Sequence, residues 1–401
     1  MNLRISLFGG WHPLFSNMKS SPTLAPLLVA AVLAFVSGKV NAQSEPASLK
    51  DVYRPFLMIG TAVNPRNYTE PAQARLVQRH FKVLTPENAM KWDSLQPRPG
   101  EFQFAEADRL VEFARRNNMY VVGHTLVWHS QTPRWVFEEA PGKPASRELL
   151  LKRMREHITA VLGRYKGKVQ AWDVVNEALE EDGTLRNSPW RRIIGDDFIE
   201  RAFEYARQAD PAAALYYNDF RLEVPSKCAG AIGIVKRLKK AGLRIDGVGI
   251  QGHVNLTNPT VAEQEAAIVA IHQAGVKAMI TELDVDVLPG RKGWGDADIQ
   301  RREAADAALD PYRTELPANI QRQLADRYAE LFRMYLKNRD KLNRVTLWGL
   351  SDGDSWLNGF PIGGRTNHPL LFDRSLRAKP ALQAVLNEAA EFQSRLPGAR
   401  R

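Results

Sequence analysis

Cysteine is almost absent from this 401-residue chain, which contains only Cys228. A single cysteine excludes an internal disulfide and a zinc site built from a cysteine cluster. The residues around Cys228 have helical spacing, so we predict that it is a small core residue and not a nucleophile.

A continuous block of basic residues is also missing, although the formal net charge is +10. Lysine and arginine are spread over predicted helical faces, as at Arg115–Arg116, Lys239–Lys240 and Arg301–Arg302. We interpret this charge as solvated helix surface, and we expect no nucleic-acid partner. Attraction to an acidic polymer is the alternative reading of the same charge.

Long hydrophobic runs are missing, with one short exception near the start of the chain. Residues 24–36, LAPLLVAAVLAFV, have the length of a signal-peptide core and are short for a membrane span. Lys19 precedes this run, and the small residues VNA at 40–42 precede Gln43. We predict a signal peptide at 1–42, with Met18 as an alternative start, and secretion to the periplasm or the medium without membrane attachment after cleavage. An uncleaved anchor is the alternative.

Eight short apolar runs follow, and they predict strands. They lack polar alternation, which is typical of strands buried on both faces of a parallel sheet. The runs are FLMIGTA (56–62), FKVLT (81–85), YVVGHTLVW (120–128), VQAWDVV (169–175), ALYYN (214–218), GVGIQ (247–251), VKAMIT (276–281) and VTLWGL (345–350).

Amphipathic segments alternate with these runs and predict helices at about 70–80, 105–117, 146–165, 196–209, 225–241, 259–274, 317–336 and 379–391. Ser146 is the expected N-cap of the third helix. Eight strand–helix units favour an α/β fold, a single (β/α)₈ TIM barrel over 43–396 followed by a basic tail at 397–401. A doubly wound open sheet is less favoured, because no G-x-G-x-x-G follows the first strand. We expect a monomer.

Polar residues cluster where the predicted strands end, which is the catalytic face of such barrels. The most prominent pair is Glu177 and Glu282, which are 282 − 177 = 105 residues apart and follow the fourth and seventh strands. Two carboxyl groups facing each other across the barrel mouth are the minimum equipment for glycoside hydrolysis. Tryptophans and amides at the other strand ends suit a sugar, whose faces are apolar and whose hydroxyls need polar partners.

A metal centre is the competing use of histidine and aspartate in a barrel. His124 and His129 are five residues apart, a spacing that suits neither one helix face nor one strand face. We therefore predict no catalytic metal and no cofactor. Calcium in the aspartate-rich segments 284–298 or 352–354 is left open.

Seven motifs together resemble glycoside hydrolase family 10, the endo-β-1,4-xylanases. In chain order they are TPENAMKW, GHTLVWHSQTP, WDVVNEAL, YYNDF, IQGH, ITELDV and LWGLSDGDSW, and the resemblance runs from about Tyr53 to Leu386. It implies a (β/α)₈ barrel that cleaves internal β-1,4 bonds of xylan and its oligosaccharides with retention, and the predicted signal peptide adds secretion. Glu177 would be the general acid/base and Glu282 the nucleophile.

The resemblance also implies roles for the residues around the two glutamates. Asn176 would bind the 2-hydroxyl of the sugar at the cleaved bond, and His253, held by Asp284, would orient Glu282 and keep it ionised. The remaining sugar contacts would come from Glu87, Asn88, Lys91, His124, Trp128, Gln251, His253, Trp348 and Trp356. Chemistry requires a raised pKa at Glu177, which we expect from a poorly hydrated pocket and the charge of Glu282.

Two features depart from the family pattern. Arg221 replaces an expected asparagine after YYNDF, where it would either alter contacts on the aglycone side or face solvent. The segment 288–316 is long, and it would either line the substrate groove or form a solvated loop. A β-1,4-glucanase on the same barrel, or a carbohydrate-binding protein without activity, are the alternative functions.

Overall fold

The computed structural model describes residues 47–289 and 307–396. The predicted signal peptide, the basic tail and most of the 288–316 segment lie outside these ranges. Each predicted strand is present, and every boundary lies within three residues of its predicted position except the end of β10, which extends five residues further. The barrel strands are β1 (Met58–Val63), β2 (Val83–Pro86), β3 (Tyr120–Val127), β6 (Ala171–Asn176), β7 (Ala214–Asp219), β8 (Gly247–Ile250), β10 (Lys277–Asp286) and β11 (Leu342–Leu347).

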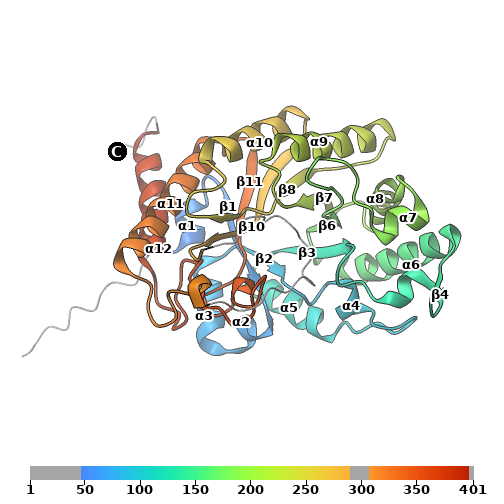
Figure 1. The fold of residues 1–401 in the computed structure, drawn as a ribbon, viewed down its shortest axis with the longest axis horizontal. Helices are drawn as coiled ribbons and strands as arrows, with labels where there is room; N and C mark the ends of the chain where they lie inside the picture. Colours follow the sequence, from blue (N-terminus) through green and yellow to red (C-terminus); the bar gives the residue numbers. More distant parts are fainter. Residues whose placement is uncertain (1–46, 290–306, 397–401) are drawn as a thin grey trace, which may run out of the picture. The chain divides into compact units, whose positions relative to one another are not determined.

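These eight strands pair in parallel in the order β1-β2-β3-β6-β7-β8-β10-β11, and β11 pairs back with β1. The sheet is therefore closed, and the prediction of a TIM barrel is confirmed. Because every strand runs the same way, the carboxyl ends of all eight lie at one mouth of the barrel. In Figure 1 the strands occupy the centre and the helices lie around them.

The eight predicted helices are also present. They are α3 (Pro71–His80), α5 (Ala105–Arg116), α6 (Arg147–Tyr165), α8 (Phe198–Ala209), α9 (Pro225–Lys240), α10 (Val261–Gln273), α11 (Ala318–Lys337) and α12 (Pro380–Ser394). Ser146 caps α6 as predicted, because its Oγ accepts a hydrogen bond from Leu149 N at 3.2 Å. Cys228 is buried on α9, in agreement with its prediction as a core residue.

Shorter elements fall in the loops and were not predicted, since a single turn carries no measurable periodicity. They are α1 (Leu49–Tyr53), α2 (Pro65–Thr69), α4 (Trp92–Leu95), η1 (Arg134–Phe137), β4 (Glu138–Ala140), β5 (Lys143–Pro144), α7 (Pro189–Ile194), β9 (His253–Asn255), η2 (Ala307–Leu309) and η3 (Trp356–Asn358). Most of them follow the carboxyl end of a barrel strand, so they shape the mouth of the barrel.

The interior of the barrel is tightly packed, which explains the lack of polar alternation in the strands. Val83, Val122, Ala171, Tyr216 and Met279 form one buried cluster contributed by five different strands. Higher on β3, a Cβ atom added to Gly123 would lie 2.1 Å from the ring of Trp172 on β6. Glycine is therefore required here by the neighbouring indole and not by backbone conformation.

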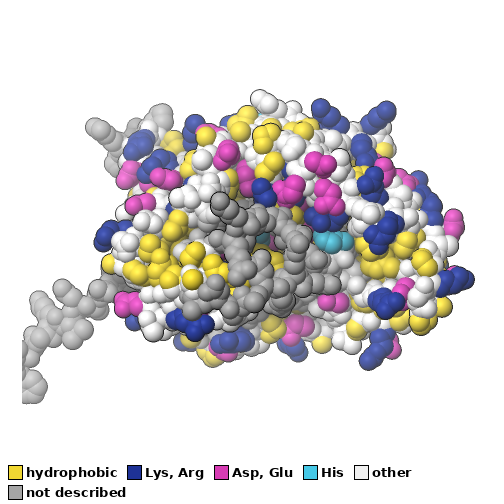
Figure 2. All heavy atoms as spheres, viewed as in Figure 1, with side chains coloured by type: hydrophobic (Ala, Val, Ile, Leu, Met, Phe, Trp, Pro, Cys, Tyr) yellow, Lys and Arg dark blue, Asp and Glu magenta, His cyan; other side chains and the backbone are white. Residues whose placement is uncertain are grey.

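No described helix is long and apolar enough to cross a lipid bilayer. On the face shown in Figure 2, basic and acidic side chains are interspersed, without a block of one sign. This distribution matches the interpretation of the positive charge as solvated surface.

We expect Gly123→Ala to lower the free energy of unfolding by about 1–3 kcal/mol, because the new methyl group overlaps the Trp172 ring. Urea denaturation measures the change. Gly163→Ala is the matched control, because Gly163 is exposed on α6 with no atom within 4 Å of an added Cβ. That control should gain up to about 1 kcal/mol of stability. Equal stabilities for the two variants would contradict the packing described here.

Candidate active site

The two predicted catalytic glutamates both lie at the barrel mouth and are both buried. Glu177 directly follows β6, Glu282 lies on β10, and each is 5% exposed. Burial penalises a charged carboxylate, so the state of each group depends on the donors and charges around it.

Glu177 accepts one hydrogen bond on each carboxylate oxygen. Trp128 Nε1 donates to Oε2 at 2.8 Å, and Gln251 Nε2 donates to Oε1 at 2.8 Å. Burial raises the pKa of Glu177, and the negative charges of Asp219 and Glu282 raise it further, against the two donors. Asp219 has the larger effect of the two, and sequence reasoning had named only Glu282.

The backbone of Glu177 has a positive φ of 55°, which is rare for a residue with a side chain. Such a conformation costs on the order of 1–3 kcal/mol and persists only where the surroundings hold it. Glu177 N donates to Asn218 O at 2.9 Å, and Arg186 Nε donates to Glu177 O at 3.2 Å. The next amide, Ala178 N, donates to Tyr217 Oη at 3.1 Å. These contacts turn the chain sharply at the strand end.

Glu282 is surrounded by donors. His253 Nε2 lies 3.2 Å from Oε2, and Asn218 Nδ2 donates to Oε1 at 2.8 Å. Burial alone would raise the pKa of Glu282, but His253, His124 and Asn218 together lower it. Glu282 is thus stabilised as a carboxylate, the opposite of Glu177.

His253 is itself held between two carboxylates. Its Nδ1 lies 3.0 Å from Asp284 Oδ1, and Asp284 Oδ2 accepts from Trp356 Nε1 at 2.8 Å. Burial would lower the pKa of His253, but Asp284 and Glu282 raise it to about 10. A protonated imidazole can donate to both carboxylates at once.

Asn218 joins the two halves of the site. Its Nδ2 donates to Asn176 Oδ1 at 2.9 Å and to Glu282 Oε1, while its Oδ1 accepts from Thr281 Oγ1 at 2.6 Å. A Cβ atom on Gly249 of β8 would lie 2.2 Å from Asn218 Oδ1, so glycine makes room for this amide. In the sequence, Asn218 is the last residue of the predicted strand 214–218, and it has no assigned role.

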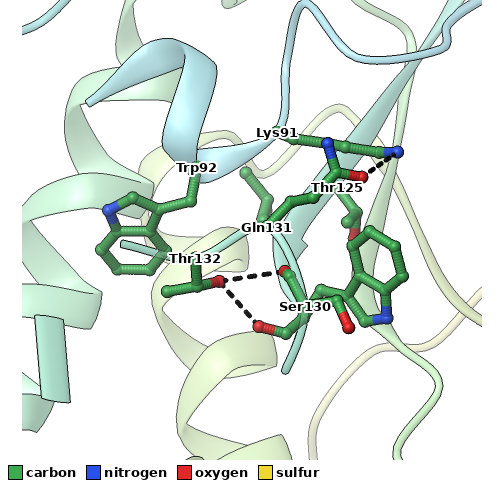
Figure 3. Close-up of a pocket in the computed structure, with 8 residues that line it drawn as sticks. Lys91, Trp92, Thr125, Ser130, Gln131 and Thr132 are labelled. Atoms are coloured by element: carbon green, nitrogen blue, oxygen red, sulfur yellow. Dashed lines mark hydrogen bonds between the residues drawn. The ribbon is translucent and has the colours of Figure 1, made fainter. Parts of the chain in front are cut away.

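A second group of polar residues lies after β2. Lys91 is 6% exposed, and its Nζ donates to Gln131 Oε1 at 2.7 Å and Asn88 Oδ1 at 3.1 Å. Figure 3 shows Lys91 and Gln131 directed toward each other, while Trp92 points away from them. Burial lowers the pKa of Lys91, whereas Glu87 counteracts this effect. Glu87, Asn88 and Lys91 therefore form one cluster, with Gln131 as an additional member.

Aromatic rings complete the site. Trp348 packs edge-on against His124 at 5.4 Å between ring centroids, and Trp356 lies 4.8 Å from the His253 ring. His124 is fixed by Asp173, because Nδ1 and Oδ2 are 3.0 Å apart. Sequence reasoning missed Asp173, which reads as part of an apolar strand. The residues predicted for the site thus gather at this mouth of the barrel.

Of the two departures from the expected pattern, Arg221 lies in the described part of the chain, and the 288–316 segment does so only at its two ends. Arg221 has a φ of 53°, and its Nη1 lies 3.1 Å from Glu181 Oε2, with both side chains about 40% exposed. Beyond residue 306, Tyr312 O lies 3.0 Å from His368 Nε2, which attaches the end of the long segment to the loop after β11.

Within the described ranges, no group of three or more histidine, cysteine, aspartate and glutamate side chains is arranged to hold a metal ion.

This arrangement pairs a carboxyl group whose pKa is raised with one whose pKa is lowered. Environments that push two carboxyl pKa values apart are the signature of an acid and a nucleophile working on one bond.

Comparison with known proteins agrees with the geometry. The chain is 43% identical over 347 residues to "Endo-1,4-beta-xylanase A" of Xylanibacter ruminicola, covering 86% of this chain and 94% of that protein. It is 39% identical to "Thermostable celloxylanase" of Thermoclostridium stercorarium, covering 90% and 94% of the two chains. A solved family 10 endoxylanase from a sugarcane soil metagenome superimposes with a TM-score of 0.82 at 47% identity, covering 85% of this chain and 99% of that one.

The sequence profile described as "Glycosyl hydrolase family 10" matches residues 48–388, which span the whole barrel from α1 into α12. The chain belongs to glycosyl hydrolase family 10.

Proposed function

We propose that this protein is an endo-1,4-β-xylanase that hydrolyses xylan with retention of configuration. The observation that carries the proposal is the pair of buried carboxyl groups, Glu177 and Glu282, whose pKa values are shifted in opposite directions. Retaining glycoside hydrolysis needs one proton donor and one ionised nucleophile at the same bond. Family membership and the xylanases among the relatives support the same function.

In the first step, a carboxylate oxygen of Glu282 forms a bond to the anomeric carbon while the bond to the leaving oxygen breaks. Glu177 gives its proton to that oxygen, so the departing chain leaves as an alcohol and Glu177 becomes ionised. In the second step, Glu177 takes a proton from water, the water oxygen bonds to the anomeric carbon, and Glu282 leaves as a carboxylate. Two inversions restore the original configuration.

The electrostatic coupling between the glutamates suits both steps. The charge of Glu282 helps to raise the pKa of Glu177 before the reaction. That charge disappears when the ester to the sugar forms, so the pKa of Glu177 falls and the group stays ionised as a base for water.

The amide of Asn176 supports its role at the sugar 2-hydroxyl. Its Oδ1 is occupied by Asn218 Nδ2 at 2.9 Å and Gln251 Nε2 at 3.4 Å. Its Nδ2 donates to no residue in the described part of the chain, so this donor is available to a sugar oxygen. The same reasoning applies to Lys91, whose ammonium has three protons and two amide partners.

A β-1,4-glucanase activity is the second candidate, because one close relative is named a celloxylanase. Trp348 and Trp356 favour xylan, since rings packed against His124 and His253 would wall the central subsite and exclude a CH₂OH substituent. A binding protein without activity is less favoured, because it has no need of two facing carboxyl groups.

We also propose that the protein is exported, on the signal-peptide pattern of residues 1–42. Mass spectrometry of protein recovered from the periplasm or medium should find an N-terminus at Gln43. Protein that remains in the cytoplasm and begins at Met1 or Met18 would contradict this expectation.

Glu177→Gln and Glu282→Gln should each lower xylan hydrolysis at least about a thousandfold, because each removes a group that acts in bond breaking. Reducing-end release from xylan and from carboxymethyl cellulose measures the loss and the substrate preference together. Glu388→Gln is the matched control, since Glu388 is a buried glutamate on α12 paired with Arg333. Proton NMR should show the β-anomer first. An α-anomer first, or full activity in either variant, would refute the mechanism.

His253→Gln should move the acidic limb of the kcat/KM profile to higher pH by about one unit. The sign follows because His253 favours the ionised form of Glu282, so its removal raises the pKa of the nucleophile. Activity against pH on xylo-oligosaccharides gives the limb. His272→Gln on α10 is the control and should leave the profile unchanged. An acidic limb that stays in place would show that His253 does not maintain the carboxylate.

A further inference from the structure

A buried ion pair lies at the end of the strand next to the candidate acid/base. Asp219 is the last residue of β7, and Lys227 lies on α9. Both side chains are 0% exposed, and Lys227 Nζ is 3.1 Å from Asp219 Oδ1. The ammonium also lies 3.2 Å from the centroid of the Phe220 ring, a cation–π contact that fixes it further. None of these residues has a role in the mechanism described above.

The contacts around Asp219 indicate that it is ionised. Phe220 N donates to Oδ1 at 2.9 Å, Tyr217 Oη donates to Oδ2, and the Lys227 ammonium approaches Oδ1. The positive charge of the Lys227 ammonium favours the ionised form of the Asp219 carboxyl group, and the two hydrogen-bond donors stabilise that form. Burial raises the pKa of Asp219 above its usual value, and Lys227 and Tyr217 limit that rise.

Asp219 is connected to Glu177 through two hydrogen bonds. Tyr217 Oη, which donates to Asp219, accepts from Ala178 N, the amide that follows Glu177. The strands β6 and β7 pair in register at Asn176 and Asn218, which places both strand ends side by side. Asp219 is therefore a negative charge fixed close to Glu177, at the end of the neighbouring strand.

We propose that Asp219, kept ionised by Lys227, is a positioning residue whose permanent charge keeps Glu177 protonated before each catalytic cycle and basic enough to take a proton from water in the second step. This inference rests on the proposed function. Glu282 cannot supply the second effect, because its charge is lost in the covalent intermediate. The pKa direction agrees, because after burial Asp219 contributes more to the raised pKa of Glu177 than Glu282 does.

Other charged and titratable groups also surround Glu177 and bear on its titration. They are Lys91 after β2, Arg186 after β6, Tyr217 and Asp219 on β7, and Glu282 on β10. The direct contacts from the ends of β3 and β8, Trp128 and Gln251, are not titratable. Of the negative charges in this set, Asp219 takes no part in bond making, so it can be neutralised without removing a reacting group.

Asp219→Asn should move the alkaline limb of the kcat/KM profile to lower pH by about one unit or more, because removal of the negative charge lowers the pKa of Glu177. Near neutral pH, hydrolysis of xylo-oligosaccharides should fall about tenfold. An aryl β-xylobioside with a dinitrophenyl leaving group needs no proton in the first step, so its kcat/KM should stay within about twofold of the unaltered enzyme. A merely structural defect would lower kcat/KM equally for both substrates.

Two further variants keep the test decisive. Asp219→Asn combined with Lys227→Met removes both buried charges, so it folds without an unpaired ammonium and should shift the limb in the same direction by less. Asp352→Asn is the matched control, because Asp352 is also 0% exposed and paired with a lysine, Lys379 Nζ at 2.9 Å, away from Glu177. It should leave the limb in place.

The outcomes separate this inference from the proposed function. An unmoved alkaline limb in folded Asp219→Asn or in the double variant, or equal losses on the two substrates, overturns the role of Asp219 alone. An unaltered enzyme without xylan hydrolysis, or a fully active Glu177→Gln, overturns the function itself.

Discussion

A charge that leaves water must find compensation, and this requirement organises the mouth of the barrel. Glu282, Asp284 and His253 form a row in which a protonated imidazole is shared by two carboxylates. Asp219 and Lys227 form a second buried pair of opposite charges, between the end of β7 and α9. Because unpaired buried charges are strongly unfavourable, the partners of these groups are as constrained as the reacting groups themselves.

The two glutamates, Glu177 and Glu282, are compensated unequally, and this inequality shifts their pKa values in opposite directions. Glu282 has a cationic neighbour and becomes a carboxylate, whereas Glu177 has two neutral donors and two anionic neighbours. Parallel strand pairing is responsible for this arrangement, because it delivers one or two polar residues from each strand end to a common place. The catalytic arrangement thus depends on the order of the strands around the barrel more than on any single residue.

The architecture could be predicted from the sequence, because eight apolar runs and eight amphipathic segments each carry a periodic signal. Glu177 and Glu282 were also predictable, since acids seldom end apolar strands. The roles of Asn218, Asp219 and Asp173 were not, because they depend on contacts between elements, with Glu282 on β10, Lys227 on α9 and His124 on β3 respectively. The short helices at the mouth were missed for the reason that one turn leaves no pattern.

The missing side chain of Gly249 sets a limit on engineering. Replacing glycine by alanine is a general route to thermostability, because it reduces the entropy of the unfolded chain. On β8 that route is closed, since the space of one methyl group is already occupied by the Asn218 amide. Stabilising glycine-to-alanine substitutions must therefore be sought on the outer helices of this barrel. Gly249 has to remain glycine beside the Asn218 amide, although glycine gives the unfolded chain more conformational entropy to lose on folding.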